Sequence, residues 1–486
     1  MEKKDLKPAG VFKYFEEICQ VPRPSKKEEK MIAYLKAFGA KHNLETKVDE
    51  AGNVLIKKPA TPGKENLQTV VLQSHIDMVC EKNNDVQHDF LTDPIETEID
   101  GEWLKAKGTT LGADNGIGVA TELAILADDS IEHGPLECLF TVDEETGLTG
   151  AFALQEGFMS GDILLNLDSE DEGEIFIGCA GGIDSVAEFN YKEVEIPAGY
   201  FFFKVEVKGL KGGHSGGDIH LGRGNANKIL NRFLSRMAAR HDLYLCEING
   251  GNLRNAIPRE AYTICAVPED AKHDVRTELN IFTSEMEDEL SVVEPDLKLV
   301  LESETPRKTA IDQDTTTRLL KALYAAPHGV YAMSQDIPGL VETSTNLASV
   351  KMKPNHVIRI ETSQRSSILS ARNDMANTVR AVFQLAGANV TFGEGYPGWK
   401  PNPHSAILEV AVESYKRLFG VDAKVKAIHA GLECGLFLDK YPTLDMISFG
   451  PTLTGVHSPD ERMLIPTVEK FWKHLLDILA HVPAKK

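Results

Sequence analysis

Polar residues follow short apolar runs at five places in this chain, and this recurring pattern constrains the fold more than any other feature. The five segments are QSHIDM (73–78), LGADNG (111–116), FTVDEETG (140–147), LLNLDSE (164–170) and SFGPTLTGVHSPDE (448–461). Strand-like runs that alternate with helical spacing predict a layered α/β domain. Functional side chains of open α/β sheets gather beyond the carboxyl ends of the strands, so we expect these five segments to converge.

The chain is too long for one ordinary core. It has 486 residues, and chains beyond about 250–300 residues divide into domains. The alternation of strand-like and helical segments changes near Glu195 and resumes after Gly393. Between these points the order of helices and strands partly recurs, as two successive α+β groups. We therefore predict a mixed-sheet α/β/α domain formed by residues 1–186 and 396–486. An α+β domain of two halves, residues 187–395, is inserted into it.

Composition and charge exclude several classes of protein. The net charge of −21 repels phosphate backbones, which argues against nucleic-acid binding. No stretch approaches the ~20 apolar residues of a membrane span, and the N-terminus has neither the apolar core nor the cleavage site of a signal peptide. Seven scattered cysteines without a CxxC pair indicate reduced thiols. We expect a soluble, cytoplasmic protein without a membrane or nucleic-acid partner.

The first and second polar segments each have two interpretations. Residues two apart on a strand face the same side, so Asp77 can accept a proton from His75 and leave the other ring nitrogen for a metal. Alone, an HxD pattern is more often just a polar strand end. Asp114 lies in a glycine-rich loop at a helix start, where aspartate is a common N-cap. The functional alternative is a carboxylate that bridges two cations.

The remaining segments add carboxylates and a second histidine. Glu144 and Glu145 repel each other unless cations or solvent separate them. One of them can bind a metal while the other faces a water as a general base, although a solvated turn is the simpler interpretation of such a pair. Asp168 and His457 also end apolar runs. Together, two histidines and three carboxylates suit paired Zn²⁺, Mn²⁺ or Co²⁺ ions, which can polarise a carbonyl.

The motifs HIDMV, GADNGIGVA, TVDEETGLTGA, LNLDSE and GVHSPDE, in this order and at these separations, resemble the metallopeptidase family of aminoacylase, peptidase T, carnosinases and bacterial dipeptidases. The segments FEEICQVPRPSKKEEKM, GGHSG and GNLRNAIPRE extend the resemblance nearly end to end. The long insertion and the blocks CAGGIDS and HAGLECGLF are most similar to members that act on Xaa-His dipeptides. The resemblance therefore implies metal-dependent hydrolysis of unblocked dipeptides, including Xaa-His and carnosine-like substrates.

The resemblance also implies two divalent metal ions per chain, with zinc as the first choice and cobalt or manganese as alternatives. His75 and Asp168 would bind one ion, Glu145 and His457 would bind the other, and Asp114 would bridge both. No other cofactor is implied, because loops for NAD, pyridoxal phosphate or nucleotides are absent from the sequence.

Two further residues would carry the proton chemistry of this family. Asp77 would orient His75, and Glu144 would act as the general base toward a metal-bridging water. The inserted domain would act as a lid. On the lid, His214 would reach the scissile carbonyl oxygen.

Three residues would hold the ends of a small peptide substrate. Asn255 and Arg365 would bind its carboxylate, and Glu433 would take its ammonium group. Each also has an ordinary structural interpretation: Asn255 precedes an Ile-Pro turn, and Arg365 is one of many arginines.

Two other functions stay open. An aminoacylase or deacetylase acting on N-acyl amino acids would use the same metals. A non-catalytic metal-binding or peptide-binding protein is the second alternative, and Glu144 argues against it because a binding protein needs no base. Lids of this family often dimerise and lend their histidine across the interface, so we expect a homodimer. The doubled insertion leaves open that the site closes within one chain.

Overall fold

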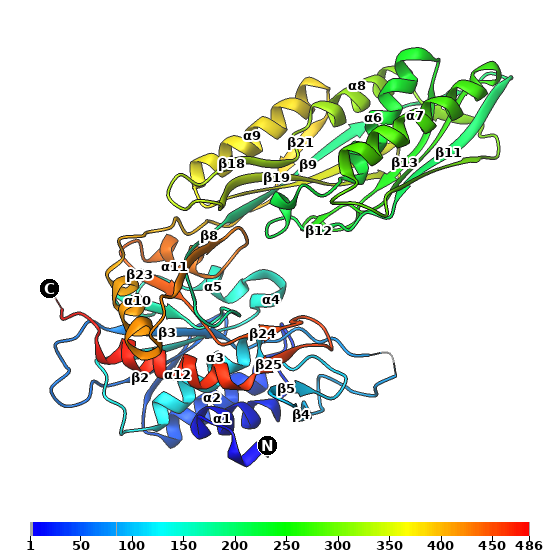
Figure 1. The fold of residues 1–486 in the computed structure, drawn as a ribbon. Coiled ribbons are helices and arrows are strands. Elements are labelled where there is room, and N and C mark those ends of the chain that lie inside the picture. The colour runs from blue at the N-terminus through cyan, green and yellow to red at the C-terminus, as the bar shows by residue number, and fades with distance from the viewer. Residues whose placement is uncertain (1–2, 84, 486) are drawn as a thin grey trace. The chain divides into compact units, whose positions relative to one another are not determined.

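The computed structural model describes residues 3–83 and 85–485 and divides into two compact units. Unit 1 consists of Met1–Cys179, Trp399–Ala427 and Leu432–Lys486, and unit 2 consists of Ala180–Gly398 and Ile428–Gly431. Their elements are labelled in Figure 1. Unit 2 is therefore formed mainly by one long insertion into the sequence of unit 1.

Unit 1 is built on an eight-stranded mixed sheet. Its strands, in spatial order, are β1 (Glu45–Val48), β2 (Val54–Lys58), β6 (Leu136–Thr141), β3 (Val70–His75), β7 (Ile163–Asn166), β23 (Asp445–Ser448), β8 (Glu174–Cys179) and β22 (Lys424–Ile428). The four central strands β6, β3, β7 and β23 run parallel. Strands β2 and β8 pair with them in antiparallel fashion. The predicted mixed sheet is confirmed.

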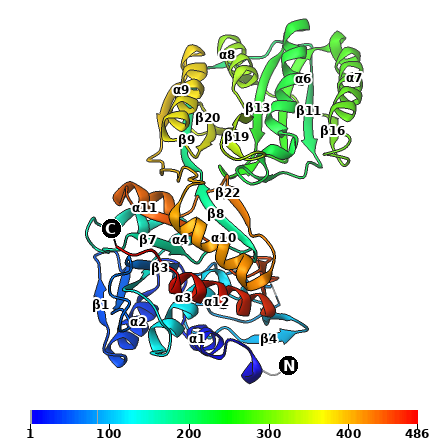
Figure 2. The same ribbon diagram turned by 60° about the vertical axis from the view of Figure 1, so that its left-hand side comes forward.

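Helices cover both faces of this sheet, as Figures 1 and 2 show. On one side lie α1 (Ala9–Cys19), α2 (Glu29–Lys41), α3 (Ala113–Ala127) and α12 (Ile465–Ala480), and on the other lie α4 (Glu144–Gly147), α5 (Thr149–Ala153) and α11 (Cys434–Lys440). Helix α10 (Ala406–Phe419) packs against α12 and β23. Every residue of β3, β6 and β7 is buried, as expected for parallel strands between helical layers.

A second, four-stranded sheet in unit 1 brings distant segments together. It consists of β24 (Leu453–Thr454), β25 (Arg462–Leu464), β5 (Trp103–Ala106) and β4 (Thr97–Asp100). Strands β24 and β25 enclose the turn that carries His457, while β5 leads toward the start of α3. This sheet therefore fixes the C-terminal polar segment beside the segment that contains Asp114.

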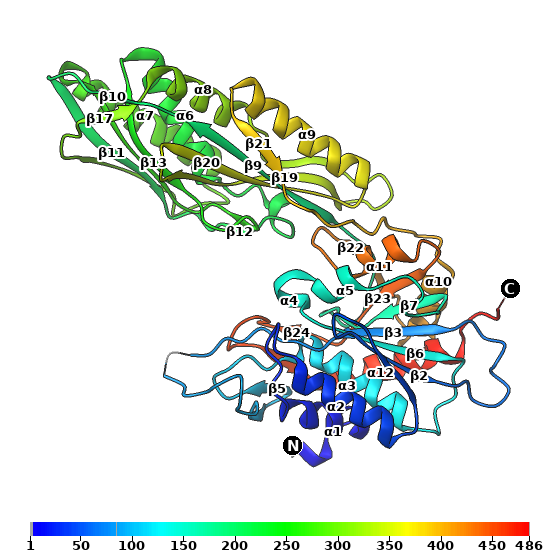
Figure 3. The same cartoon turned by 180° about the vertical axis from the view of Figure 1, so that it is seen from behind.

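Unit 2 has one nine-stranded sheet. Its strands are β16 (Lys298–Ser303), β11 (Tyr200–Lys208), β15 (Ala261–Pro268), β13 (Tyr244–Gly250), β19 (Val341–Lys353), β20 (Val357–Ser366), β9 (Gly181–Asn190) and β21 (Asn389–Phe392), with β18 (Gly329–Met333) paired to β19. Its helices are α6 (Ala226–Arg240), α7 (Lys272–Leu290), α8 (Gln313–Ala325) and α9 (Leu369–Leu385), and they lie on one face (Figure 3). Phe203, Phe233, Phe282 and Phe383 belong to the main hydrophobic core between them.

Short elements complete the chain. Two two-stranded sheets pair β10 (Glu193–Glu195) with β17 (Thr309–Ile311) and β12 (Gly213–His214) with β14 (Ala256–Ile257). Three turns of 3₁₀-helix are η1 (Lys3–Asp5), η2 (Ile219–Leu221) and η3 (Glu269–Ala271). No helix in the described part of the chain is both long and apolar enough to cross a membrane.

The sequence pattern predicts most of these elements but not two long strands of unit 2, β9 and β19. In β19 the consecutive residues Thr343, Ser344, Thr345 and Asn346 are all buried. Hydrophobic alternation cannot detect this part of the strand, because four successive buried positions are polar.

Candidate active site

Four of the five polar segments meet because their strands are adjacent and parallel. His75 is the last residue of β3, Glu144 and Glu145 begin α4 just after β6, and Asp168 follows β7. His457 lies in the turn between β24 and β25, beyond the end of β23. Parallel neighbours end at the same edge of a sheet, so these side chains come from one edge.

The segment LGADNG differs from the expectation that it follows a strand. Strand β5 already ends at Ala106, and Asp114 lies at the kinked start of α3. Gly112 takes a left-handed conformation (φ 68°), which turns the chain into the helix. Asp114 therefore reaches the cluster from a helix start, and only its neighbours in space come from strand ends.

The carboxylate of Asp114 lies between two imidazoles. Its Oδ1 is 3.0 Å from Nε2 of His75, and its Oδ2 is 3.1 Å from Nε2 of His457. Asp168 Oδ1 is 3.3 Å from Nε2 of His75, and Glu145 Oε2 is 3.0 Å from Nε2 of His457. The five side chains thus form two sets of donors that share Asp114.

These donors fit two divalent metal ions. Imidazole nitrogens and carboxylate oxygens are the ligands that Zn²⁺, Mn²⁺ and Co²⁺ accept. Glu145 Oε1 is buried and has no hydrogen-bond partner among the described residues. A buried carboxylate oxygen without a partner is costly, and a cation would satisfy it.

Without a cation, protons must balance the negative charge. Hydrogen bonds to Asp114 and Glu145 raise the pKa of His457 to about 11. Burial opposes protonation of His75, but Asp168, Asp114 and Asp77 outweigh it and raise its pKa well above the usual value. Burial raises the pKa of Asp168 to about 6.

Asp77 connects His75 to the turn that presents the two glutamates. Its Oδ1 lies 3.3 Å from Nδ1 of His75. It accepts hydrogen bonds from Ser25 Oγ at 2.7 Å and from the backbone N–H groups of Glu144 and Glu145 at 3.1 and 3.3 Å. Burial opposes ionisation of Asp77, but its hydrogen bonds outweigh burial and lower its pKa.

Glu144 is the first residue of α4 and follows Asp143, whose φ of 50° bends the chain sharply after β6. Burial raises the pKa of Glu144 well above the usual value, and the charges of Asp168, Glu433 and Glu145 add to this effect. Carboxyl groups with raised pKa values are suited to proton transfer near neutral pH.

Glu433 also lies in unit 1, just before α11, and is 1% exposed. Its Oε2 accepts hydrogen bonds from Gln73 Nε2 at 2.7 Å and Thr141 Oγ1 at 2.8 Å, whereas the buried Oε1 has no partner among the described residues. Burial, together with the charge of Asp168, raises the pKa of Glu433 to about 8. The raised pKa favours the neutral carboxyl, and the buried Oε1 is available to a positively charged group that would favour the ionised form.

The other predicted substrate residues lie in unit 2. His214 on β12 pairs with Ala256 on β14, and Ser215 N donates to the Asn255 carbonyl at 2.8 Å, so His214 and Asn255 are near neighbours. Backbone N–H groups of Gly217 and Gly216 donate to Nδ1 of His214 at 3.0 and 3.3 Å. An accepting Nδ1 places the proton of a neutral imidazole on Nε2.

Arg365 on β20 is a buried guanidinium. Its Nη1 donates to the hydroxyl of Tyr396 at 3.0 Å, and its Nε has no partner among the described residues. Burial and, after it, the charge of Arg365 lower the pKa of His214 to about 4. Arg365 is thus a buried cation beside a neutral imidazole.

Sequence reasoning did not assign a role to two neighbours of Arg365. Tyr396 accepts the hydrogen bond described above. His429 is buried with Nε2 2.7 Å from Ser344 Oγ, and burial followed by the Arg365 charge lowers its pKa to about 3. His429 stands in the block HAGLECGLF, but only its three-dimensional position reveals that it lies near Arg365.

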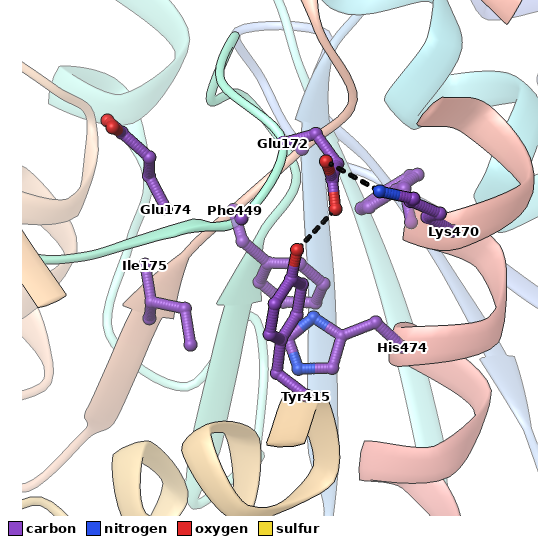
Figure 4. A pocket seen from close by; sticks show the side chains of 10 residues that line it. Glu172, Glu174, Ile175, Tyr415, Phe449, Lys470 and His474 are labelled. Carbon is purple, nitrogen blue, oxygen red and sulfur yellow. Dashed lines mark hydrogen bonds and ion pairs between the residues drawn. The ribbon is translucent and has the colours of Figure 1, made fainter. Parts of the chain in front are cut away.

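A small pocket in unit 1 is lined by none of the predicted site residues (Figure 4). Three of its polar side chains are paired with neighbouring groups. The Tyr415 hydroxyl donates to Glu172, Lys470 lies 3.2 Å from Glu172, and His474 Nε2 lies 2.8 Å from the Ala411 carbonyl. These contacts anchor the segment that follows β7, so we assign the pocket a structural role.

Comparisons with known proteins identify the family. Residues 71–481 match the model of peptidase family M20/M25/M40, and the chain belongs to this family. It is 46% identical over 484 residues to cytosol non-specific dipeptidase of Escherichia coli K12, and the match covers 100% of both chains. The resemblance inferred from the motifs is therefore confirmed.

Solved structures agree with this fold. The crystal structure of aminoacylhistidine dipeptidase from Vibrio alginolyticus is similar with a TM-score of 0.92 and 46% identity, covering 100% of this chain and 99% of that one. A tripeptidase from Staphylococcus aureus has a TM-score of 0.58 at 17% identity, covering 98% and 99% of the two chains, and shares the fold.

Metal binding should release protons. The pKa of His457 near 11 and the raised pKa of His75 keep both imidazoles protonated at pH 7 in the metal-free site. A metal ion needs a neutral imidazole, so binding of two ions should displace about two protons. The metal-bound form holds fewer protons, so affinity should rise with pH and weaken as pH falls. Calorimetry in buffers of different protonation enthalpy measures this release; heats that do not depend on the buffer would contradict it.

Proposed function

We propose that this chain is a two-metal dipeptidase that hydrolyses unblocked dipeptides, including Xaa-His and carnosine-like substrates. The observation that carries the proposal is Asp114, whose two oxygens face His75 and His457 separately. The enzyme class predicted from the sequence agrees with both full-length relatives, which are named as dipeptidases. The preference for Xaa-His is supported by the Vibrio alginolyticus relative, which is named for that substrate class.

Zinc is the metal we propose first, with cobalt and manganese as alternatives. His75 and Asp168 would hold one ion, Glu145 and His457 the other, and Asp114 both. Bound there, two such ions polarise a carbonyl and make water a stronger nucleophile at neutral pH. The distances from Asp114 to the two imidazoles support this division of the ligands.

Glu144 would act as the general base. It would take a proton from the attacking water as the new C–O bond forms, and it would then give that proton to the leaving amine as the peptide C–N bond breaks. Asp77 would support this step indirectly, because it accepts hydrogen bonds from the backbone of Glu144 and Glu145. The same carboxylate would keep His75 in the orientation that presents Nε2 to the site.

His214 would stabilise the oxyanion that develops on the scissile carbonyl. Its Nδ1 accepts backbone hydrogen bonds, which places a donor hydrogen on Nε2. Burial and Arg365 keep its pKa near 4, so the ring stays neutral and its tautomer fixed over the working pH range. A fixed donor directed at developing charge is the usual device of an oxyanion hole.

The ends of the substrate would be recognised by opposite charges. Arg365 is a buried guanidinium whose Nε has no partner among the described residues, and it would bind the carboxylate together with Asn255. Glu433 would take the ammonium through Oε1, which no described residue contacts by a hydrogen bond, and an arriving cation would favour the ionised form of this carboxyl.

We also propose a division into domains, an oligomeric state and a cellular location. Residues 1–186 and 396–486 would form the catalytic domain, and residues 187–395 would form a lid of two α+β halves that brings its polar residues to the substrate. We further propose a cytoplasmic homodimer; the Escherichia coli relative is named as a cytosolic enzyme, which supports the location.

Metal removal tests the proposal most simply. EDTA should abolish the release of histidine from Ala-His, and Zn²⁺, Mn²⁺ or Co²⁺ should restore it. Asp114→Ala should lower activity more than replacement of any other ligand, because a bridging ligand serves both ions. Full activity in a preparation verified as metal-free would end the two-metal proposal. Faster release of histidine from N-acetyl-His than from Ala-His would favour the aminoacylase alternative.

Substitutions of the two adjacent glutamates should have different effects on metal content and on kcat. Glu144→Gln should keep both metals and lose about 10²–10⁴-fold in kcat, because the general base is gone while the shape remains. Glu145→Gln should instead lower metal occupancy. Elemental analysis with kcat measurement distinguishes the variants, and the reverse pattern would exchange the two roles.

The charged substrate ends should restrict substrate length. Only a dipeptide would present its carboxylate one residue beyond the scissile bond, so Ala-His should be cut faster than its amide or Ala-His-Ala. Arg365→Ala should remove the preference for the free acid over the amide, because the charge that recognises the carboxylate is gone. Comparison of kcat/KM for the three peptides decides this. Equal wild-type rates would contradict recognition of the carboxylate.

A further inference from the structure

Glu461 is a buried carboxylate outside the residues assigned above, and four successive backbone N–H groups donate to it. Its Oε2 accepts from Leu111 and Gly112 at 2.7 and 2.9 Å, and its Oε1 accepts from Ala113 and Asp114 at 2.8 and 3.3 Å. Glu461 is 2% exposed. This one side chain therefore fixes the backbone of the turn that carries Asp114 into α3.

Arg23 holds the same turn through its carbonyl groups. It is 2% exposed, and its Nη2 donates to the Gly112 carbonyl at 2.6 Å. Its Nη1 donates to the carbonyls of Ile76 and Asp77 at 3.2 and 3.0 Å. Arg23 thus joins the turn of Asp114 to the segment that directly follows His75.

The charged groups of Arg23 and Glu461 form their hydrogen bonds with backbone groups. A buried charge is costly unless hydrogen bonds satisfy it. Among the described residues, neither Arg23 nor Glu461 forms an ion pair with another side chain. The close approach also requires glycine, because a Cβ on Gly112 would lie 2.6 Å from Arg23 Nη2. The peptide groups of the turn thus lie between a buried anion and a buried cation.

Glu461 also lies only four residues after His457. The turn that contains both residues is closed by pairing of β24 with β25. One short segment therefore supplies the imidazole that faces Asp114 Oδ2 at 3.1 Å and the carboxylate that holds the Asp114 backbone. The separation between Asp114 and His457 depends on this double attachment.

We propose that Glu461, together with Arg23, is a positioning residue that sets Asp114 and His457 at the separation that metal binding requires. The inference rests on the proposed function, since it needs Asp114 and His457 to be ligands. Glu461 acts through the backbone of the turn and is not among the proposed metal ligands or substrate-binding residues.

Glu461→Gln tests the proposal with little change of volume. An amide nitrogen cannot accept hydrogen bonds, so two of the four N–H groups would face another donor. Metal affinity should fall about 10–100-fold, as is usual when a group that orients a metal ligand is lost. Competition with a chromophoric chelator for Zn²⁺ measures affinity without an activity assay. The metal concentration for half-maximal activity should rise, with the KM for Ala-His at saturating metal unchanged.

Glu137→Gln is the matched control. Glu137 is also 2% exposed, but it lies at the opposite end of β6 from the cluster. It accepts from Ser160 N at 2.7 Å, Ser160 Oγ at 2.6 Å and Lys57 Nζ at 2.6 Å. Its replacement should lower Tm as much as that of Glu461 while leaving Zn²⁺ affinity at the wild-type value.

Arg23→Lys provides a second variant in case Glu461→Gln does not fold. A lysine ammonium cannot reproduce the planar fork of arginine, so the Gly112 and Asp77 carbonyls would lose their common donor, and Zn²⁺ affinity should again fall. If the Glu461→Gln protein folds and binds Zn²⁺ with wild-type affinity, the inference is overturned. If that variant does not fold, wild-type Zn²⁺ affinity in the Arg23→Lys protein overturns the inference instead. A wild-type chain that binds no Zn²⁺ would instead overturn the proposed function, so the two failures are distinguishable.

Discussion

Electrostatic repulsion among carboxylates is the constraint on which the site depends. Asp114, Glu144, Glu145 and Asp168 meet beside His75 and His457 in a largely buried cluster. Burying several anions together is costly unless cations or protons balance them. The structure places the two oxygens of Asp114 toward different histidines, so that each imidazole stands where positive charge is needed. Two divalent cations would satisfy this arrangement better than protons, because a cation could also satisfy the buried Oε1 of Glu145.

The fold supplies this cluster through the order of its strands. β6, β3, β7 and β23 are neighbours in unit 1 although they come from opposite ends of the chain. Parallel pairing brings their carboxyl ends to one edge, and the small sheet of β24, β25, β5 and β4 adds the turns around His457 and Asp114. Arg23 and Glu461 then hold the connecting backbone with buried charges. The scaffold therefore does more than collect the ligands, since it also fixes their separations.

The sequence predicts the parts of this design that depend on local pattern. Apolar runs indicate the central strands, and their polar ends nominate His75, Glu144, Glu145 and Asp168. The pattern places Asp114 at a helix start, as the structure has it, but the expectation that LGADNG directly follows a strand was wrong. The pattern also does not detect the polar strand β19. These errors share a cause, because each depends on tertiary packing rather than on periodicity.

The roles of buried charges are equally hidden from local pattern. In the sequence, Arg23, Glu461 and His429 lie within motifs, but nothing in the local pattern assigns them a role. Their hydrogen-bond partners lie far away in the chain, as between Glu461 and Leu111. Motif resemblance identifies the family and nominates its ligands, whereas geometry nominates the residues that would hold those ligands in place.

The central claim is that Asp114 bridges two ions, and the magnetic coupling of a paramagnetic metal pair tests it most directly. The apo-protein would be loaded with Mn²⁺ to two ions per chain and studied by electron paramagnetic resonance. Two ions about 3.5–4 Å apart and joined by a shared ligand should give a spin-coupled signal. That signal should be lost in Asp114→Ala at the same metal loading. A spectrum of two independent Mn²⁺ ions in the wild-type protein would contradict the account.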